Sequence, residues 1–200
     1  ARDYVSRSLE GDRYALTMKL FHLGTLFPPL RRLVMQAQPL MDSFALRTMQ
    51  SVHLVVADMG YAHVVAQASS RAAWEFRLRV GAQLNLLDTS SGLTLLAFQD
   101  DDVAAQMLRS TPGGAPDITA EIAVELSKVR AAGHRKGPSQ QLVGVTDISV
   151  PVRSVNDAAV AVLTCPFLPR GEPRSGSTEP LNVDDTIAQL LDTAAQLSKP

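Results

Sequence analysis

The segment 53–80 most constrains the fold, because it predicts three strands in succession with no helix between them. Residues 53–57 and 61–67 are rich in strand-forming residues, and Asp58-Met59-Gly60 joins them as a hairpin turn. In the third strand, 74–80, apolar side chains alternate with charged ones, so one face is apolar and the other is solvated. A solvated face is typical of antiparallel sheets, and consecutive strands do not fit a doubly wound parallel sheet.

Helices are expected on both sides of these strands. Residues 15–27 show helical spacing, and Pro28-Pro29 begin a longer helix with an apolar stripe. Pro39 either bends this helix or divides it into two helices at Gln38, and both interpretations remain open. The remaining elements are expected as helices over 91–98, 100–108, 118–132 and 182–197, strands over 142–152 and 158–165, and loops over 81–87 and 137–139. This order indicates an α+β fold.

Composition limits the class of protein. The chain has 200 residues and a formal net charge of −1, with 46% hydrophobic and 20% charged residues, which predicts a soluble globular domain with one attached element. Cys165 is the only cysteine, which excludes an intrachain disulfide and agrees with a reducing compartment. No apolar run approaches the roughly 20 residues of a membrane helix, so we expect a cytoplasmic protein with no membrane partner. Because the chain begins at Ala1 within a predicted element, we also expect it to be a fragment.

Residues 88–97 read D-T-S-S-G-L-T-L-L-A and predict the start of an apolar helix. Thr89 or Ser90 can cap this helix with a side-chain oxygen, which leaves other backbone N–H groups of the first turn free. Gly92 has no side chain to block approach to them. Such a helix start suits a carboxylate or another anion, whereas the simpler interpretation is a well-formed cap with no ligand.

Motifs for catalysis or metal binding are not apparent. His53 and His63 lie on neighbouring predicted strands and could meet, but no third ligand has recognisable spacing, so we expect no metal. Asp100-Asp101-Asp102 is better explained as acidic residues that stabilise a helix start. Cys165 is expected to be a buried, inert thiol, with a pocket wall as the alternative. We therefore expect no enzyme, no catalytic residues and no cofactor.

The N-terminal segment Tyr4–Leu16 predicts a hairpin with a polar turn at 9–12. Arg2, Arg7 and Arg13 lie on it and either contact phosphates or belong to an ordinary solvated hairpin. An isolated hairpin is marginally stable in water, so we expect a packing partner on its N-terminal side.

Three motifs in order resemble a known family. D-Y-V-S-R-S-L-E-G-D-R-Y-A-L-T-M-K-L-F-H-L-G resembles the wing of a winged helix-turn-helix with a linker helix, and R-V-G-A-Q-L-N-L-L-D-T-S-S-G-L-T-L-L-A resembles the ligand-binding loop and helix of IclR-type bacterial transcription regulators. V-R-A-A-G-H and G-V-T-D-I-S-V-P-V-R-S-V-N-D-A-A-V-A-V-L-T are similar to the end of that family's effector domain. The resemblance implies residues 1–26 as the wing and linker helix. It implies residues 27–200 as a GAF-like (profilin-like) α+β domain, with a curved antiparallel sheet of about five or six strands flanked by helices.

The resemblance also implies a ligand pocket and places residues in it. Ser90, Ser91 and Gly92 would offer N–H groups and hydroxyls to a carboxylate. The other implied lining residues are Leu84, Phe76, Val145, Asp147, Leu163 and Cys165. Asp147 would repel a carboxylate unless it is protonated or bonds a ligand hydroxyl.

The same resemblance implies a function. Many members carry pocket serines where Leu163 and Cys165 stand here, so we expect a ligand with a carboxylate at one end and an apolar body, such as an aromatic or aliphatic catabolic intermediate. Binding would change the geometry of a homodimer or a dimer of dimers and thereby its binding to double-stranded operator DNA, which Arg7 and Arg13 would contact. The alternative is a GAF-like dimerisation or interaction module with no small-molecule ligand.

Overall fold

The computed structural model describes residues 3–7, 13–26, 28–72, 75–111, 118–169 and 182–198. It divides into two compact units, residues 1–36 and residues 37–200. Several expected features lie outside the described residues, namely Arg2, the turn at 9–12, Trp74 and most of the loop before residue 118.

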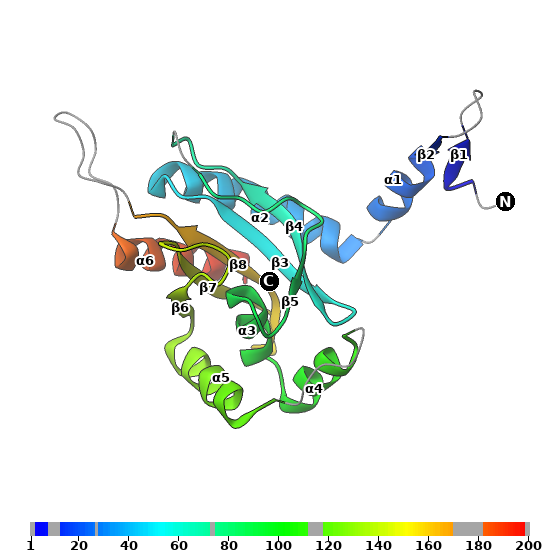
Figure 1. Cartoon of the computed structure of the whole chain (residues 1–200). Helices are drawn as coiled ribbons and strands as arrows, with labels where there is room; N and C mark the ends of the chain where they lie inside the picture. Colours follow the sequence, from blue (N-terminus) through cyan, green and yellow to red (C-terminus); the bar gives the residue numbers. More distant parts are fainter. Residues whose placement is uncertain are drawn as a thin grey trace. The chain divides into compact units, whose positions relative to one another are not determined.

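The first unit contains the expected hairpin and the helix that follows it. Strand β1 (Val5–Arg7) pairs antiparallel with β2 (Tyr14–Leu16), and α1 (Met18–Thr25) comes next (Figure 1). The Thr17 hydroxyl donates to the backbone oxygen of Asp3 at 2.7 Å, which ties the start of this unit to the start of its helix. The apolar residues of α1 are largely exposed, as expected for a segment that lacks a packed core of its own.

Helix α2 (Pro28–Thr48) is continuous, with Pro39 inside it, so the single-helix interpretation holds. Its C-terminal half is apolar on one face and belongs to the second unit. Ala37, Met41 and Phe44 there are fully buried. Arg47 in its last turn donates to the side chain of Gln189 at 2.9 Å, which links this helix to α6 (Val183–Leu197).

One six-stranded antiparallel sheet, in the order β5-β4-β3-β8-β7-β6, organises the second unit. Its strands are β3 (Val52–Asp58), β4 (Tyr61–Ala68), β5 (Gln83–Asn85), β6 (Arg135–Pro138), β7 (Thr146–Arg153) and β8 (Ala159–Phe167). Met59 and Gly60 form the predicted turn between β3 and β4, both with positive φ, which is the geometry of a tight hairpin. The curled sheet with flanking helices confirms the predicted α+β class.

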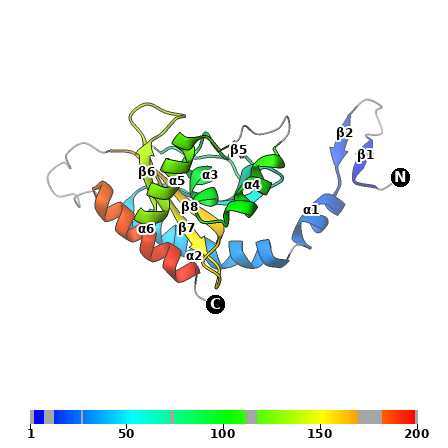
Figure 2. The ribbon, with the colours of Figure 1, turned by 90° about the horizontal axis from the view of Figure 1, so that it is seen from below.

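Helices cover both faces of this sheet (Figures 1 and 2). Helix α6 packs on β7 and β8, while α3 (Ser90–Ala97), α4 (Asp101–Arg109) and α5 (Ala120–Ala132) lie on the other face. Leu95, Leu96 and Ala97 of α3 are buried in the core that these three helices form with the sheet. Because the sheet is covered on both sides, β8 is apolar on both faces.

The predicted strand 74–80 is wrong for the residues that are described. Residues 75–80 have no regular structure, and the edge strand is β5, within a segment expected to be a loop. The exposure of these side chains nevertheless alternates as predicted, because Phe76 and Leu78 are half-buried while Arg77 is exposed. The N–H of Leu78 bonds to the side chain of His53, so this donor is not available to a neighbouring strand.

A second correction concerns β6, which occupies part of the expected turn at 137–139. Pro138 is tolerated there because β6 is the edge strand of the sheet. The pairing of β6 with β7 ends opposite Ser149, so Pro151 lies beyond it at a local edge, where a missing N–H is tolerated. Within the described residues, no helix combines the length and apolar character that crossing a bilayer requires.

Candidate functional site

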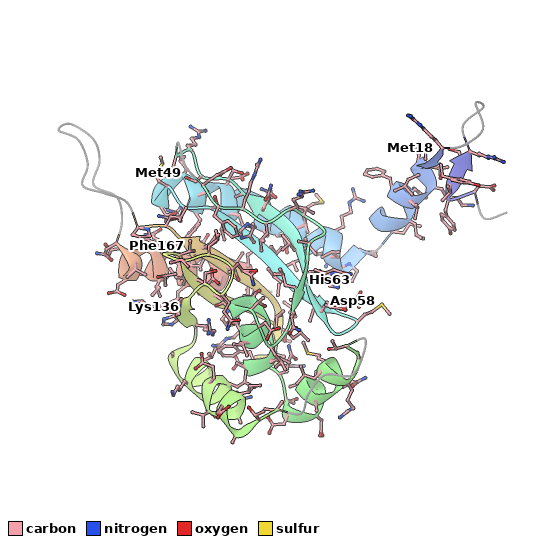
Figure 3. All side chains as sticks on the ribbon, viewed as in Figure 1. Met18, Met49, Asp58, His63, Lys136 and Phe167 are labelled. Carbon is pink, nitrogen blue, oxygen red and sulfur yellow. The ribbon has the colours of Figure 1, made fainter. Side chains whose placement is uncertain are left out.

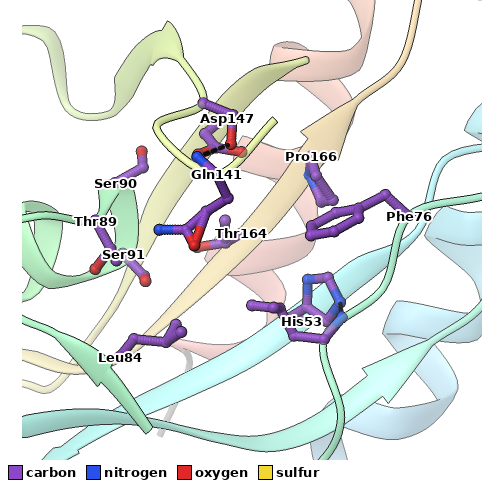
Figure 4. A pocket seen from close by; sticks show the side chains of 12 residues that line it. His53, Phe76, Leu84, Thr89, Ser90, Ser91, Gln141, Asp147, Thr164 and Pro166 are labelled. Atoms are coloured by element: carbon purple, nitrogen blue, oxygen red, sulfur yellow. Dashed lines mark hydrogen bonds between the residues drawn. The ribbon is translucent and has the colours of Figure 1, made fainter. Parts of the chain in front are cut away.

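A cavity of about 30 Å³ lies between the start of α3 and the sheet (Figure 4). Strands β3, β7 and β8 contribute four lining residues, namely His53, Asp147, Thr164 and Pro166. Four more come from β5 and the start of α3, namely Leu84, Thr89, Ser90 and Ser91. The loops that complete it contribute Phe76, Leu78, Ser139 and Gln141. A single water molecule needs about 10–15 Å³ of accessible volume, so the cavity is small.

The start of α3 lines this cavity and contains backbone N–H groups without a hydrogen-bond partner in the described ranges. Thr89 is the N-cap, and its hydroxyl oxygen accepts from the N–H of Gly92 at 3.2 Å while its proton goes to the backbone oxygen of Asn85. Among the hydrogen bonds of the described residues, none involves the N–H of Ser90 or Ser91. Both residues are buried, so these donors are shielded from bulk water. The arrangement favours an acceptor with negative charge.

Gly92 has a packing role that its sequence did not predict. Its N–H is already bonded to Thr89, so it is not a free donor. A Cβ at this position would overlap the backbone of Leu86, so α3 approaches the preceding loop more closely than any side chain permits.

A chain of three buried hydroxyls connects two lining residues, Ser90 and Thr164, through Ser149, which does not itself line the cavity. Ser149 of β7 donates to Ser90 at 2.9 Å, and Ser149 and Thr164 are 2.9 Å apart. Since Ser149 has one hydroxyl proton and gives it to Ser90, Thr164 donates to Ser149. The proton of Ser90 then remains for another acceptor. Ser149 and Thr164 were missed in the sequence because isolated hydroxyl residues on strands carry no distinctive pattern.

The sheet residues differ from those that the resemblance implied. Asp147 lines this cavity, and Thr164 and Pro166 of β8 also line it, whereas Leu163 and Cys165 lie at the alternate positions of β8. Val145 is buried and does not line it either.

Two ionisable groups near the site have shifted pKa values. Burial raises the pKa of Asp147, and a hydrogen bond from Ser139 and the charge of Arg135 oppose that shift. Cys165 is buried as expected, and burial, together with the nearby charge of Asp147, raises the pKa of its thiol, which disfavours the reactive thiolate.

His53 is the most buried polar side chain of the lining, at 1% exposure. Its Nε2 accepts from the N–H of Leu78 at 2.8 Å, and its Nδ1 has no hydrogen-bond partner. Burial lowers the pKa of His53 to about 4. A polar interaction with the backbone of Thr164, opposite His53 across the β3–β8 pair, raises the pKa and offsets part of this shift. The geometry of this interaction is not that of a hydrogen bond, so Nδ1 remains without a partner.

The two histidines that the sequence singled out do not meet. His53 pairs in register with Gln67, whereas His63 pairs with Val56. The ring of His63 lies 3.1 Å from the backbone oxygen of Asp58 beside the hairpin turn (Figure 3). In the part of the chain that the structure describes, no group of three or more His, Cys, Asp or Glu residues is placed to hold a metal ion.

Arg7 and Arg13 lie in the first unit. Arg7 ends β1, Arg13 directly precedes β2, and both are exposed.

A family model described as the bacterial transcriptional regulator IclR C-terminal domain matches residues 30–199. The chain belongs to the IclR family. Two relatives of that family are the HTH-type transcriptional regulators KdgR of Escherichia coli, 29% identical over 170 residues, and of Dickeya chrysanthemi, 27% identical over 169. The matches cover 82% of this chain in each case but only 64% and 55% of those proteins, so the chain spans less than two thirds of their length.

Solved structures show the same IclR fold. A crystal structure of an IclR homolog from Microbacterium hydrocarbonoxydans, complexed with 4-hydroxybenzoate, has a TM-score of 0.74 at 24% identity and covers 98% of this chain and 78% of its own. An IclR regulator from Alicyclobacillus acidocaldarius has a TM-score of 0.74 at 22% identity with the same coverage.

Proposed function

We propose that this chain is the effector-binding part, with wing and linker helix, of a ligand-responsive DNA-binding transcription regulator. The cavity beside α3 takes a small organic acid, and the protein works in the cytoplasm as a homodimer or a dimer of dimers. The observation that carries this proposal is that Ser90 and Ser91, two buried residues with unpaired backbone N–H groups, both line one cavity.

The donors support a carboxylate at the α3 end of the ligand. Backbone N–H groups at a helix start combine with the helix dipole to favour negative charge, and their burial strengthens the interaction. The homolog that was crystallised with 4-hydroxybenzoate, an aromatic acid, supports this ligand class.

The rest of the lining supports an apolar body. Phe76, Leu78, Leu84 and Pro166 offer carbon surface to the same cavity. A volume of about 30 Å³ accommodates a polar head group, so a larger acid requires the segments 75–80 and 139–145 to move apart. Binding energy would thus be coupled to the position of these loops, which is one route to a change in dimer geometry.

The DNA-binding role rests on the first unit and on the family. Residues 1–26 form the wing and linker helix in this proposal, and residues 27–200 form the effector domain. Arg7 and Arg13, which are exposed on the hairpin, contact phosphates of the operator. In the complete protein, Arg13→Ala is expected to weaken binding to every DNA sequence alike and to reduce its salt dependence.

Thermal stability of this chain with and without organic acids tests the ligand site. An acid at 100 times its Kd stabilises the folded state by about 2.7 kcal/mol, which raises the Tm by several degrees. Ser90→Leu and Ser91→Leu are expected to abolish this rise, while Ser127→Leu on the exposed face of α5 keeps it. If no acid raises the Tm of the unmodified chain, the ligand proposal is wrong.

A second candidate is an interaction module with no small-molecule ligand, which the small volume of the cavity favours. Native mass spectrometry of the purified chain separates the two. A retained acid of low mass supports the effector site, and a dimer that forms with no response to any acid supports the module.

A further inference from the structure

The cavity wall contains a buried side-chain nitrogen that the fold leaves without a hydrogen-bond partner. His53 lies on β3, in the middle of the sheet, and its Nδ1 is buried without a hydrogen-bond partner. Buried donors and acceptors are nearly always paired, because an unpaired one costs free energy comparable to a lost hydrogen bond. An exception inside a cavity therefore indicates a missing partner.

The hydrogen bond from Leu78 determines what His53 offers. Because the N–H of Leu78 donates to Nε2 at 2.8 Å, Nε2 carries no proton. Burial keeps the ring neutral at pH 7, so its single proton is on Nδ1. His53 is therefore a donor at Nδ1, and the partner it lacks is an acceptor.

His53 lies away from the start of α3. Figure 4 shows Thr89, Ser90 and Ser91 on one side of the pocket and His53 with Phe76 on the other. A ligand whose carboxylate rests on α3 thus presents its far end to His53.

We propose that His53 is a specificity-determining residue of this site, which donates a hydrogen bond from Nδ1 to a second oxygen of the ligand. The ligand class is then a small organic acid that carries a hydroxyl or carbonyl oxygen besides its carboxylate. This inference rests on the proposed function, because it places the carboxylate at α3.

The first test needs no ligand. ¹⁵N NMR of the imidazoles in the complete chain at pH 7 distinguishes the two neutral tautomers, and His53→Gln identifies the signals of His53. We expect the proton on Nδ1, and a proton on Nε2 overturns the inference while leaving the proposed function intact.

The second test compares paired acids that differ by one hydroxyl, 4-hydroxybenzoate with benzoate and lactate with propionate, by isothermal titration. The unmodified chain is expected to bind the hydroxylated member of at least one pair about tenfold more tightly, the value of one buried hydrogen bond. His53→Phe is expected to remove this preference. His63→Phe, on the neighbouring strand and outside the cavity, is the matched control and keeps it.

The outcomes distinguish the role of His53 from the proposed function of the cavity. Binding of the acids without discrimination by the hydroxyl overturns the role of His53 alone. Absence of binding by all four acids overturns the proposed function and this inference together. Should His53→Phe fail to fold, the discrimination by the unmodified chain and the tautomer still decide the question.

Discussion

The hydroxyl of Ser149 donates a 2.9 Å hydrogen bond to the hydroxyl of Ser90. The two residues lie on β7 and at the first position of α3, 59 residues apart in sequence. This bond joins the start of α3 to the sheet, and both contribute residues to the cavity lining. It also leaves the hydroxyl proton of Ser90 free for another acceptor.

Ser149→Ala should lower the free energy of unfolding by about 1–2 kcal/mol, because it removes the shared partner of two buried hydroxyls. It should also weaken binding of any acid that Ser90 contacts. Urea denaturation measures the first effect. Ser127→Ala on the exposed face of α5 is the control and should change stability by less than about 0.5 kcal/mol. Equal effects of the two variants would argue against the hydroxyl chain.

Gly92→Ala should destabilise the chain by about 2–3 kcal/mol, because the added methyl group overlaps the backbone of Leu86 and the backbone must shift. Gly24→Ala in α1 meets no atom within 4 Å and should not destabilise, since alanine is the better helix former. Thermal melts of the two variants compare the same substitution in two helices. A neutral Gly92→Ala would show that α3 tolerates displacement from the loop.

His53 should make the chain less stable in mild acid. Its pKa is about 4 when folded and 6.5 when exposed, so the unfolded chain binds a proton that the folded chain rejects. The stability is therefore complete above pH 6.5, falls as the pH drops from 6.5 to about 4, and levels off below. The full difference corresponds to roughly 3 kcal/mol.

Urea melts across pH 4–7 measure this loss, and His53→Gln should reduce its slope. The comparison is made against His63→Gln, a half-buried position on β4, which should keep the slope of the unmodified chain. An unchanged slope in His53→Gln would assign the acid sensitivity to other groups.

Asp147→Asn should strengthen binding of a monocarboxylate, because it removes a negative charge from the cavity wall. Folding raises the pKa of Asp147, so its cost to stability grows as the pH rises above 3.8 toward the raised value. The stability advantage of Asp147→Asn should therefore widen over that interval. Titrations and melts of Asp192→Asn, an exposed residue of α6, provide the reference. Weaker binding by Asp147→Asn would indicate that this carboxylate bonds a ligand hydroxyl instead.

The local sequence was sufficient for the helix and turn signals. Thr89 caps α3 with its side chain, one of the two caps that the sequence allowed, Asn182 caps α6, and Gly133 ends α5 with a φ of 76°. These features depend on a few adjacent residues, because caps and turns are set by local hydrogen bonds and by the φ angles that each residue tolerates. The order of motifs likewise predicted the family and the α+β sheet.

The cavity lining required the tertiary structure. Both faces of β8 are buried because helices cover both sides of the sheet, so its sequence does not alternate between apolar and polar residues. The sequence therefore did not reveal that Thr164 and Pro166, rather than Leu163 and Cys165, line the cavity. The charged alternation of 75–80 predicted a strand, yet the N–H of Leu78 bonds to His53. The sequence by itself thus determined most of the helices, the β3–β4 hairpin and the family, but not the edge strands β5 and β6. The burial of His53 and its unpaired Nδ1 were decided only by packing among strands and loops that are distant in sequence.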